Sequence, residues 1–191
     1  MTGLRRLSHA ISEGQGISVL VEVDDAEAAR IAADQGAEGL VVRRGAADLR
    51  AATALPILVY GGDSDGAGGD AIVIEVAHAD EEWLDRAVGR AVEQGIECVL
   101  KVRDEDELER VLERLDPEIL LLSADLAADG EEHIERLLDL LPDVPAGKLA
   151  IAELPRPSRD DVDELERAGV DAVLVGAGDV GGLVDDPPPE V

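Results

Sequence analysis

The stretch GVDAVLVGAGD, residues 169–179, contains the pattern that decides the fold. Val173, Leu174 and Val175 form a short aliphatic run bounded by glycines, which is typical of a strand buried on both faces. The glycines that follow leave bare backbone N–H groups. Such a turn can bind a phosphate through these N–H groups, or it can simply reverse the chain without binding a ligand.

The same local pattern, a glycine followed by an acidic or small residue and then aliphatic residues, recurs three more times. The other copies are GAEGLVV (36–42), GGDAIVI (68–74) and GIECVLKV (95–102). In most copies helical periodicity precedes the glycine, which stands where a helix ends in the left-handed conformation. A repeated helix, glycine cap and buried strand predict alternating β and α elements and a parallel sheet.

Aliphatic runs predict eight strands, at 17–23, 39–42, 56–60, 71–76, 98–102, 118–122, 149–152 and 172–175. Helical periodicity predicts helices at 26–35, 46–54, 81–93, 105–114, 131–141 and 159–168. Eight strands with mostly helical crossovers favour an α/β fold of the (β/α)8 or TIM barrel type. An open doubly wound sheet is the alternative.

Two segments of the predicted barrel lack a helical pattern. GGDSDGAGGD (61–70) has too many glycines and too few apolar residues for a helix between the third and fourth strands. GAGDVGGLVDDPPPEV (176–191) leaves room for about one helical turn before the proline-rich tail at 184–191. The barrel is thus unusually short, because such barrels usually need about 200 residues or more. An N-terminal helical segment at 1–16, with Leu4, Leu7 and Ile11 on one face, is predicted to cover part of it.

Composition bounds the class of protein. The 191 residues are enough for one sizeable core, so a single domain over 1–191 is predicted. Against 17 basic residues stand 44 acidic ones, and the net charge of -27 would repel both nucleic acid and an anionic membrane. No basic leader and no apolar segment of about 18 residues occurs, which predicts a soluble, cytoplasmic protein. Cys98 is predicted to be a buried structural thiol, and the three histidines lack ligand spacing, so neither a metal nor a cofactor is predicted.

Several segments resemble one known family. LKVRDEDELERVL (100–112) is similar to the fifth strand and helix of indole-3-glycerol phosphate synthase, where the pattern is close to LVEVHDEEEL. ILLLSADL (119–126) resembles its sixth-strand pattern IGINNRDL, and residues 151–180 resemble its seventh and eighth units, which contain ESGI and GVDAVLVGESLM. The resemblance covers residues 17–180 and implies a tryptophan-pathway barrel that closes a ring on an anilino deoxyribulose phosphate with loss of its carboxylate.

The resemblance also implies where the family's catalytic side chains would lie. On the first strand, the family's glutamate and lysine fall on Glu22 and Asp24. The general-acid lysine of the third strand falls on Tyr60, and the glutamate of the fifth strand falls on Lys101. The asparagine of the sixth strand falls on Leu122, and the glutamate of the seventh strand falls on Glu153. Two of the six survive, Glu22 and Glu153. Loss of the general acid alone costs about 10²–10⁴ in rate. We therefore expect shared ancestry and fold without synthase activity.

The family's phosphate site, in the loops after strands seven and eight, is half retained. Gly176 matches the family's glycine and Gly178 stands at its serine. Leu154 and Pro155 replace a Ser-Gly pair, and proline removes a backbone donor. Arg156 is able to compensate by a charge-assisted hydrogen bond to an anion. An anion site at Gly176, Gly178 and Arg156 is one interpretation, and a plain turn is the other.

Four charged residues are expected to point inward near the C-terminal mouth of the barrel: Glu22, Glu75, Lys101 and Glu153. Because an unpaired buried ammonium is costly, Lys101 is predicted to pair with at least one of the three carboxylates. The cluster is either an ion-pair network in a barrel that no longer catalyses, or a remodelled site in which Lys101 acts as an acid or forms a Schiff base.

Three functions remain open at this stage. The first is a catalytically degenerate relative that binds a small phosphorylated molecule or another anion. The second is a lyase or isomerase of altered specificity acting on a small phosphorylated substrate, and the third is a true synthase with a rearranged site. Missing helices would also expose apolar strand faces, which predicts a homodimer, opposed by the charge of each chain.

Overall fold

Eight parallel strands close into a barrel in sequence order. The computed structural model describes residues 6–14, 16–43, 46–60, 68–77, 79–124, 130–178 and 180–183. The strands are β1 (Ser18–Glu22), β2 (Gly39–Val42), β3 (Ile57–Tyr60), β4 (Ala71–Glu75), β5 (Glu97–Val102), β6 (Ile119–Leu122), β7 (Leu149–Leu154) and β8 (Ala172–Val175). The closing pair aligns Val19 of β1 with Val173 of β8. The (β/α)8 barrel is confirmed, and the open doubly wound sheet is wrong.

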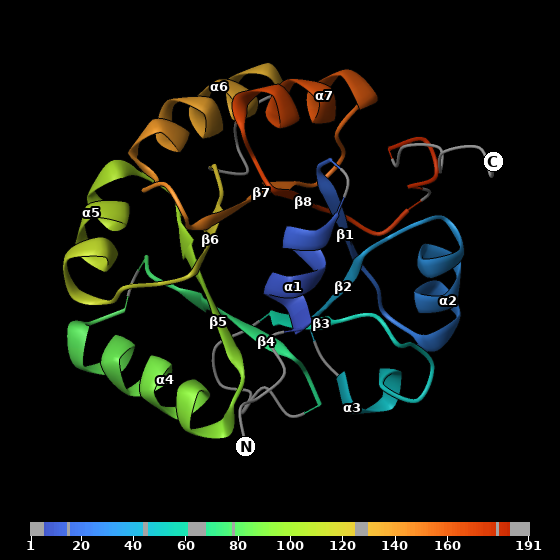
Figure 1. Ribbon diagram of the computed structural model, residues 1–191, viewed down its shortest axis with the longest axis horizontal. Coiled ribbons are helices and arrows are strands. Elements are labelled where there is room, and N and C mark those ends of the chain that lie inside the picture. The colour runs from blue at the N-terminus through green and yellow to red at the C-terminus, as the bar shows by residue number, and fades with distance from the viewer. Residues whose placement is uncertain are drawn as a thin grey trace.

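Helices surround the barrel as a ring (Figure 1). The ring consists of α2 (Ala26–Asp34), α3 (Ala46–Leu49), α4 (Glu81–Gln94), α5 (Glu105–Arg114), α6 (Gly130–Leu140), the 3₁₀ turn η1 (Leu141–Asp143) and α7 (Arg159–Ala168). Helix α1 (Arg6–Glu13) lies in the middle of this ring. The helix predicted at 46–54 ends early, at Leu49. There the hydroxyl of Thr53 accepts the N–H of Leu55, so the chain turns before Pro56 instead of continuing the helix.

Local chemistry sets the ends of these helices. The side chains of Asp25, Asp80 and Asp104 accept backbone N–H groups at the starts of α2, α4 and α5. Gly95 and Gly169 end α4 and α7 in the left-handed conformation, which glycine adopts without steric cost. At these two positions the glycine of the repeating sequence pattern thus ends the helix directly before the next strand, β5 or β8.

The strands alternate between two apolar layers. Residues such as Leu20, Val41, Leu58 and Val99 fill the barrel interior. Their chain neighbours pack outward in a second cluster shared with the helices. Because the period along a strand is two, this alternation decides which residue of each strand faces the mouth.

Helix α1 closes the N-terminal end of the barrel, and Figure 1 shows it in the middle of the ring. Leu7 and Ile11 belong to the interior cluster. The carboxylate of Glu97, at the start of β5, accepts the N–H groups of Leu7 (2.8 Å) and Ser8 (3.1 Å). Leu4, expected on the same face, lies outside the described residues.

Between β3 and β4, the described residues 68–70 form no helix, and residues 61–67 of the predicted glycine-rich crossover lie outside the described part. After β8 the described chain forms a turn at 180–183, and the tail at 184–191 also lies outside. The outward side chains of Val59 and Ile72 are nevertheless buried. A single chain does not test the homodimer, which stays a prediction. Within the described ranges, no helix has the length and apolar character needed to cross a membrane.

Candidate functional site at the barrel mouth

Each strand contributes one inward position at the C-terminal mouth. The interior residues Leu20, Val41, Leu58, Val73, Val99, Leu121, Ile151 and Leu174 are each followed, two positions later, by a residue at the mouth. These mouth positions hold Glu22, Arg43, Tyr60, Glu75, Lys101, Ser123, Glu153 and Gly176. The mouth is therefore polar, although the barrel below it is aliphatic.

Lys101, Glu153 and Tyr60 form a connected network across the mouth. The Lys101 ammonium lies 2.8 Å from Oε2 of Glu153, which confirms the predicted pairing with a carboxylate. It also donates a hydrogen bond to the hydroxyl of Tyr60. That hydroxyl donates in turn to Oε1 of Glu153 at 3.1 Å. The side chains of Lys101 and Glu153 are only 16% and 10% exposed, so their charges are held mainly by each other.

The environment sets the protonation of this network. Burial acts to raise the pKa of Glu153, but hydrogen bonds from Lys101, Ser123 and Tyr60 and the lysine's charge outweigh it, and the pKa lies below its ordinary value. Burial and the negative charge of Glu153 raise the pKa of Tyr60 far above its ordinary value. At neutral pH the network therefore holds an ionised carboxylate and a protonated phenol.

Arg43 extends the network to the first two strands, and sequence reasoning missed it. Its guanidinium donates twice to Glu22, from Nε to Oε1 at 2.6 Å and from Nη2 to Oε2 at 3.2 Å. The same guanidinium lies over the ring of Tyr60, 4.4 Å from the centroid, where a cation–π attraction holds it. Counting two positions on from Val41 would have identified Arg43 as a mouth residue.

Two positions carried over from the family differ from expectation. Leu122, on which the family's asparagine falls, packs in the outer apolar layer, and Ser123 is the inward residue that hydrogen-bonds Glu153. Asp24, at the family's first-strand lysine, is exposed beyond the end of β1. Glu75 is at the mouth as predicted, exposed at the end of β4 beside Lys101 in the register.

The predicted anion site is only partly open. The Gly176 N–H donates to the carbonyl oxygen of Pro155 at 3.1 Å. A Cβ atom at Gly176 would lie 2.7 Å from the same oxygen. A glycine at this position therefore allows the loops after β7 and β8 to approach each other closely. Gly178 and Arg156 are exposed. The N–H group of Gly176 therefore already donates a hydrogen bond within the chain. Of the three predicted residues, Arg156 and Gly178 are the two exposed to an anion in solution.

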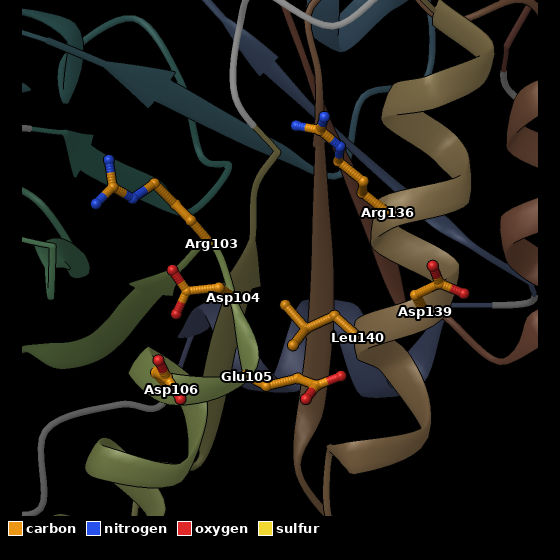
Figure 2. Close-up of a pocket in the computed structure, with 7 residues that line it drawn as sticks. All are labelled: Arg103, Asp104, Glu105, Asp106, Arg136, Asp139 and Leu140. Atoms are coloured by element: carbon orange, nitrogen blue, oxygen red, sulfur yellow. The ribbon is translucent and has the colours of Figure 1, made fainter.

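A second concavity lies outside the barrel, between the start of α5 and helix α6 (Figure 2). It is about 650 Å³ in volume and is lined by Arg103, Asp104, Glu105, Asp106, Arg136, Asp139 and Leu140. Both arginines pair with glutamates of neighbouring turns, Arg103 with Glu107 and Arg136 with Glu132. None of the predicted site residues lines this concavity.

Across the described ranges, no group of three or more potential ligand side chains is arranged to hold a metal ion.

The closed parallel barrel with polar side chains at its C-terminal mouth defines the class, a (β/α)8 barrel protein. The family model described as indole-3-glycerol phosphate synthase matches residues 62–178, which is more than half of the chain. The chain belongs to this family, as its sequence resemblance implied.

Two curated relatives carry the name of this family. An indole-3-glycerol phosphate synthase of Pelodictyon phaeoclathratiforme (strain DSM 5477 / BU-1) is 35% identical over 111 residues, which cover 58% of this chain and 43% of the relative. One of Variovorax paradoxus (strain S110) is 35% identical over 116 residues, covering 60% and 42%. The matched part of the chain thus spans less than half the length of these relatives.

Solved structures of two enzymes share the fold. An N-acetylmannosamine-6-phosphate 2-epimerase from Clostridium perfringens is similar with a TM-score of 0.64 and 12% identity, covering 83% of this chain and 86% of that one. A thiamine phosphate pyrophosphorylase from Pyrococcus furiosus has a TM-score of 0.64 and 17% identity, covering 86% and 90%. At these identities the likeness concerns the fold alone.

Proposed function

We propose that this chain is a family member without synthase activity, whose mouth network is structural and whose remaining binding capacity is for small anions. The observation that carries the proposal is the closed contact of Lys101 with Glu153 and Tyr60. An ammonium engaged in this way is neutralised inside the protein. A phenol with a raised pKa is also a weaker acid than the lysine that the family has at this position.

The proposed anion site consists of Arg156 and the turn at Gly178, in the loops after β7 and β8. Support comes from the exposure of both residues and from the guanidinium's ability to bind a phosphate by two parallel hydrogen bonds. The site is weak, because the Gly176 N–H already donates to the Pro155 carbonyl oxygen and is not free for an anion.

A second candidate function is a lyase or isomerase acting on a small phosphorylated substrate. It is favoured by one observation: Lys101, Tyr60 and Glu153 are connected by hydrogen bonds and are able to pass a proton among them. As an acid, Lys101 would give its proton to the substrate. As an amine nucleophile, it would first pass its proton to Glu153.

Two measurements test the proposal. Purified protein from a host that lacks its own synthase is assayed for indole-glycerol phosphate formation, and no turnover is expected. Titration calorimetry with inorganic phosphate is expected to show weak binding that Arg156→Ala abolishes and the exposed control Arg167→Ala retains. Turnover that disappears in Lys101→Met would overturn the proposal. Phosphate binding unaffected by Arg156→Ala would overturn the assigned anion site.

A further inference from the structure

His133 is a polar residue on the buried face of helix α6. The other described residues of this helix that are buried, Ile134, Leu137 and Leu140, are apolar. His133 is only 6% exposed, and a polar group buried to this extent needs a hydrogen-bond partner. Its Nε2 atom lies 2.9 Å from the backbone carbonyl oxygen of Glu153 on β7. Because a carbonyl oxygen only accepts, Nε2 carries a proton and donates it to this hydrogen bond.

The end of β6 explains why the Glu153 carbonyl takes a side-chain donor. The backbone N–H and C=O groups of successive residues in a strand point alternately to its two neighbouring strands. The N–H of Leu149 donates to the Glu118 carbonyl oxygen on the β6 side, so Glu153, four residues later, faces β6 as well. β6 ends at Leu122, whose partner in the register is the residue before Glu153. His133 therefore supplies the donor that one further turn of the β6 ladder would have given.

The residue held in this way, Glu153, carries the carboxylate at the centre of the mouth network. That carboxylate lies 2.8 Å from the Lys101 ammonium, accepts from the Tyr60 hydroxyl at 3.1 Å and is hydrogen-bonded by Ser123. On the β8 side, strand pairing holds the backbone at this position. On the β6 side, the imidazole of His133 holds it. The position of the carboxylate thus depends on a contact made in the outer layer of the barrel.

We propose that His133 is a positioning residue of the mouth network. By holding the Glu153 carbonyl, it keeps the carboxylate of the same residue within reach of both Lys101 and Tyr60. This role rests on the proposed function, in which the network stabilises the barrel mouth. The neutral imidazole with its proton on Nε2 and the imidazolium both donate from this atom, so the contact persists when His133 takes up a second proton.

The network contains the only tyrosine of the chain, so its state is measurable at a single site. Tyrosine labelled with carbon-13 at Cζ gives one NMR signal, from Tyr60, and that signal depends on the hydrogen bonds of the phenol. Glu153→Gln removes the ionised acceptor and so defines the signal of a disrupted network at pH 7. His133→Leu removes the donor to the Glu153 carbonyl. It is expected to move the signal most of the way toward the value in Glu153→Gln.

Two further variants separate positioning from folding. His133→Gln is expected to keep the wild-type signal, because its side-chain amide is able to donate from the place of Nε2. Leu137→Ala is the matched control, since Leu137 lies one turn further along α6 and is 2% exposed. It removes buried apolar packing and is expected to lower the free energy of unfolding while leaving the Tyr60 signal unchanged.

A wild-type Tyr60 signal in folded His133→Leu, or an equal shift in His133→Leu and Leu137→Ala, overturns the proposal. If His133→Leu does not fold, His133→Gln decides: a wild-type signal supports the proposal, and a signal near that of Glu153→Gln overturns it. The proposed function fails separately, because turnover lost in Lys101→Met would refute it whatever the Tyr60 signal in the His133 variants.

Discussion

Replacing Lys101 with methionine is the most direct perturbation of the mouth network. Methionine keeps most of the apolar stem and removes the ammonium. Glu153, whose side chain is 10% exposed, is then left with hydrogen bonds from Tyr60 and Ser123. The variant therefore measures what a nearly buried carboxylate costs when its counter-ion is taken away.

The size of the loss follows from the contacts that remain. Breaking a fully buried ion pair by removing one partner costs about 3–5 kcal/mol. Here two hydrogen-bond donors stay in place, and the Glu153 carboxyl is able to take up a proton instead of remaining charged. We therefore expect Lys101→Met to lower the free energy of unfolding by about 1–3 kcal/mol at pH 7.

The loss depends on pH with a definite sign. In the wild type the pKa of Glu153 lies below its ordinary value of 4.5, so its contribution to stability is present above that pH and is lost as pH falls through the folded-state pKa. Without Lys101, the effect of burial is no longer outweighed, and the pKa of Glu153 is expected to rise. The Lys101→Met variant then loses stability as pH rises, because folding must bury an ionised carboxylate. The difference in unfolding free energy between variant and wild type therefore becomes smaller as the pH falls from 7 to 4.

Urea unfolding followed by far-UV circular dichroism at pH 7 and pH 4 measures both quantities. Lys148→Met is the matched control, because Lys148 is the other lysine of the chain and pairs with Asp116, a 95% exposed side chain. Lys148→Met is expected to lower the free energy of unfolding by less than about 1 kcal/mol. The reasoning is refuted if Lys101→Met costs no more than Lys148→Met, or if its cost grows on acidification.

Four further outcomes are expected. Gly176→Ala should lower the free energy of urea unfolding by about 1–3 kcal/mol, because the new Cβ would lie 2.7 Å from the Pro155 carbonyl oxygen. Gly178→Ala should change it by less than about 0.5 kcal/mol, because a Cβ there would have no heavy atom within 4 Å. Asp70→Asn should lower the unfolding free energy by about 2–4 kcal/mol, because this carboxylate binds two arginines and the N–H group at the start of β3. The melting temperature should rise between low salt and about 1 M KCl, because salt screens the repulsion within a chain of charge -27. Alkylation of Cys98 at pH 8 should be slow in the folded protein and fast in urea, because burial raises the pKa of its thiol to about 11.

The barrel was predictable because its local signals are strong and repeated. Each strand is an aliphatic run of four to six residues, and the glycines at 95 and 169 end helices in the left-handed conformation as expected. Strand ends were less predictable. β7 continues to Leu154, two residues past its predicted end, because Glu153 points into the mouth, where a charged side chain does not interrupt the pairing with β8.

The site was predictable in part. The pairing of Lys101 followed from strand alternation and from the cost of an unpaired ammonium. Arg43 was missed because it follows the aliphatic run of β2, where apolar patterning has already ended. The family resemblance placed its asparagine at Leu122, which packs in the outer layer, whereas alternation from Leu121 leads to Ser123 as the inward residue on β6.

The mouth keeps a cation while changing the strand that supplies it. The sequence resemblance implies that the family's lysine on β3 and glutamate on β5 correspond to Tyr60 and Lys101, and that its glutamate on β7 corresponds to Glu153. Because Lys101 bonds to Tyr60, its ammonium reaches toward β3, and the positive charge lies next to the strand that carries it in the family. A lysine on β3 would meet a carboxylate on β5 as well as one on β7. Here the single ammonium is shared by Glu153 and the phenol, which supports the proposal that the retained charges now stabilise the barrel mouth instead of acting on a substrate.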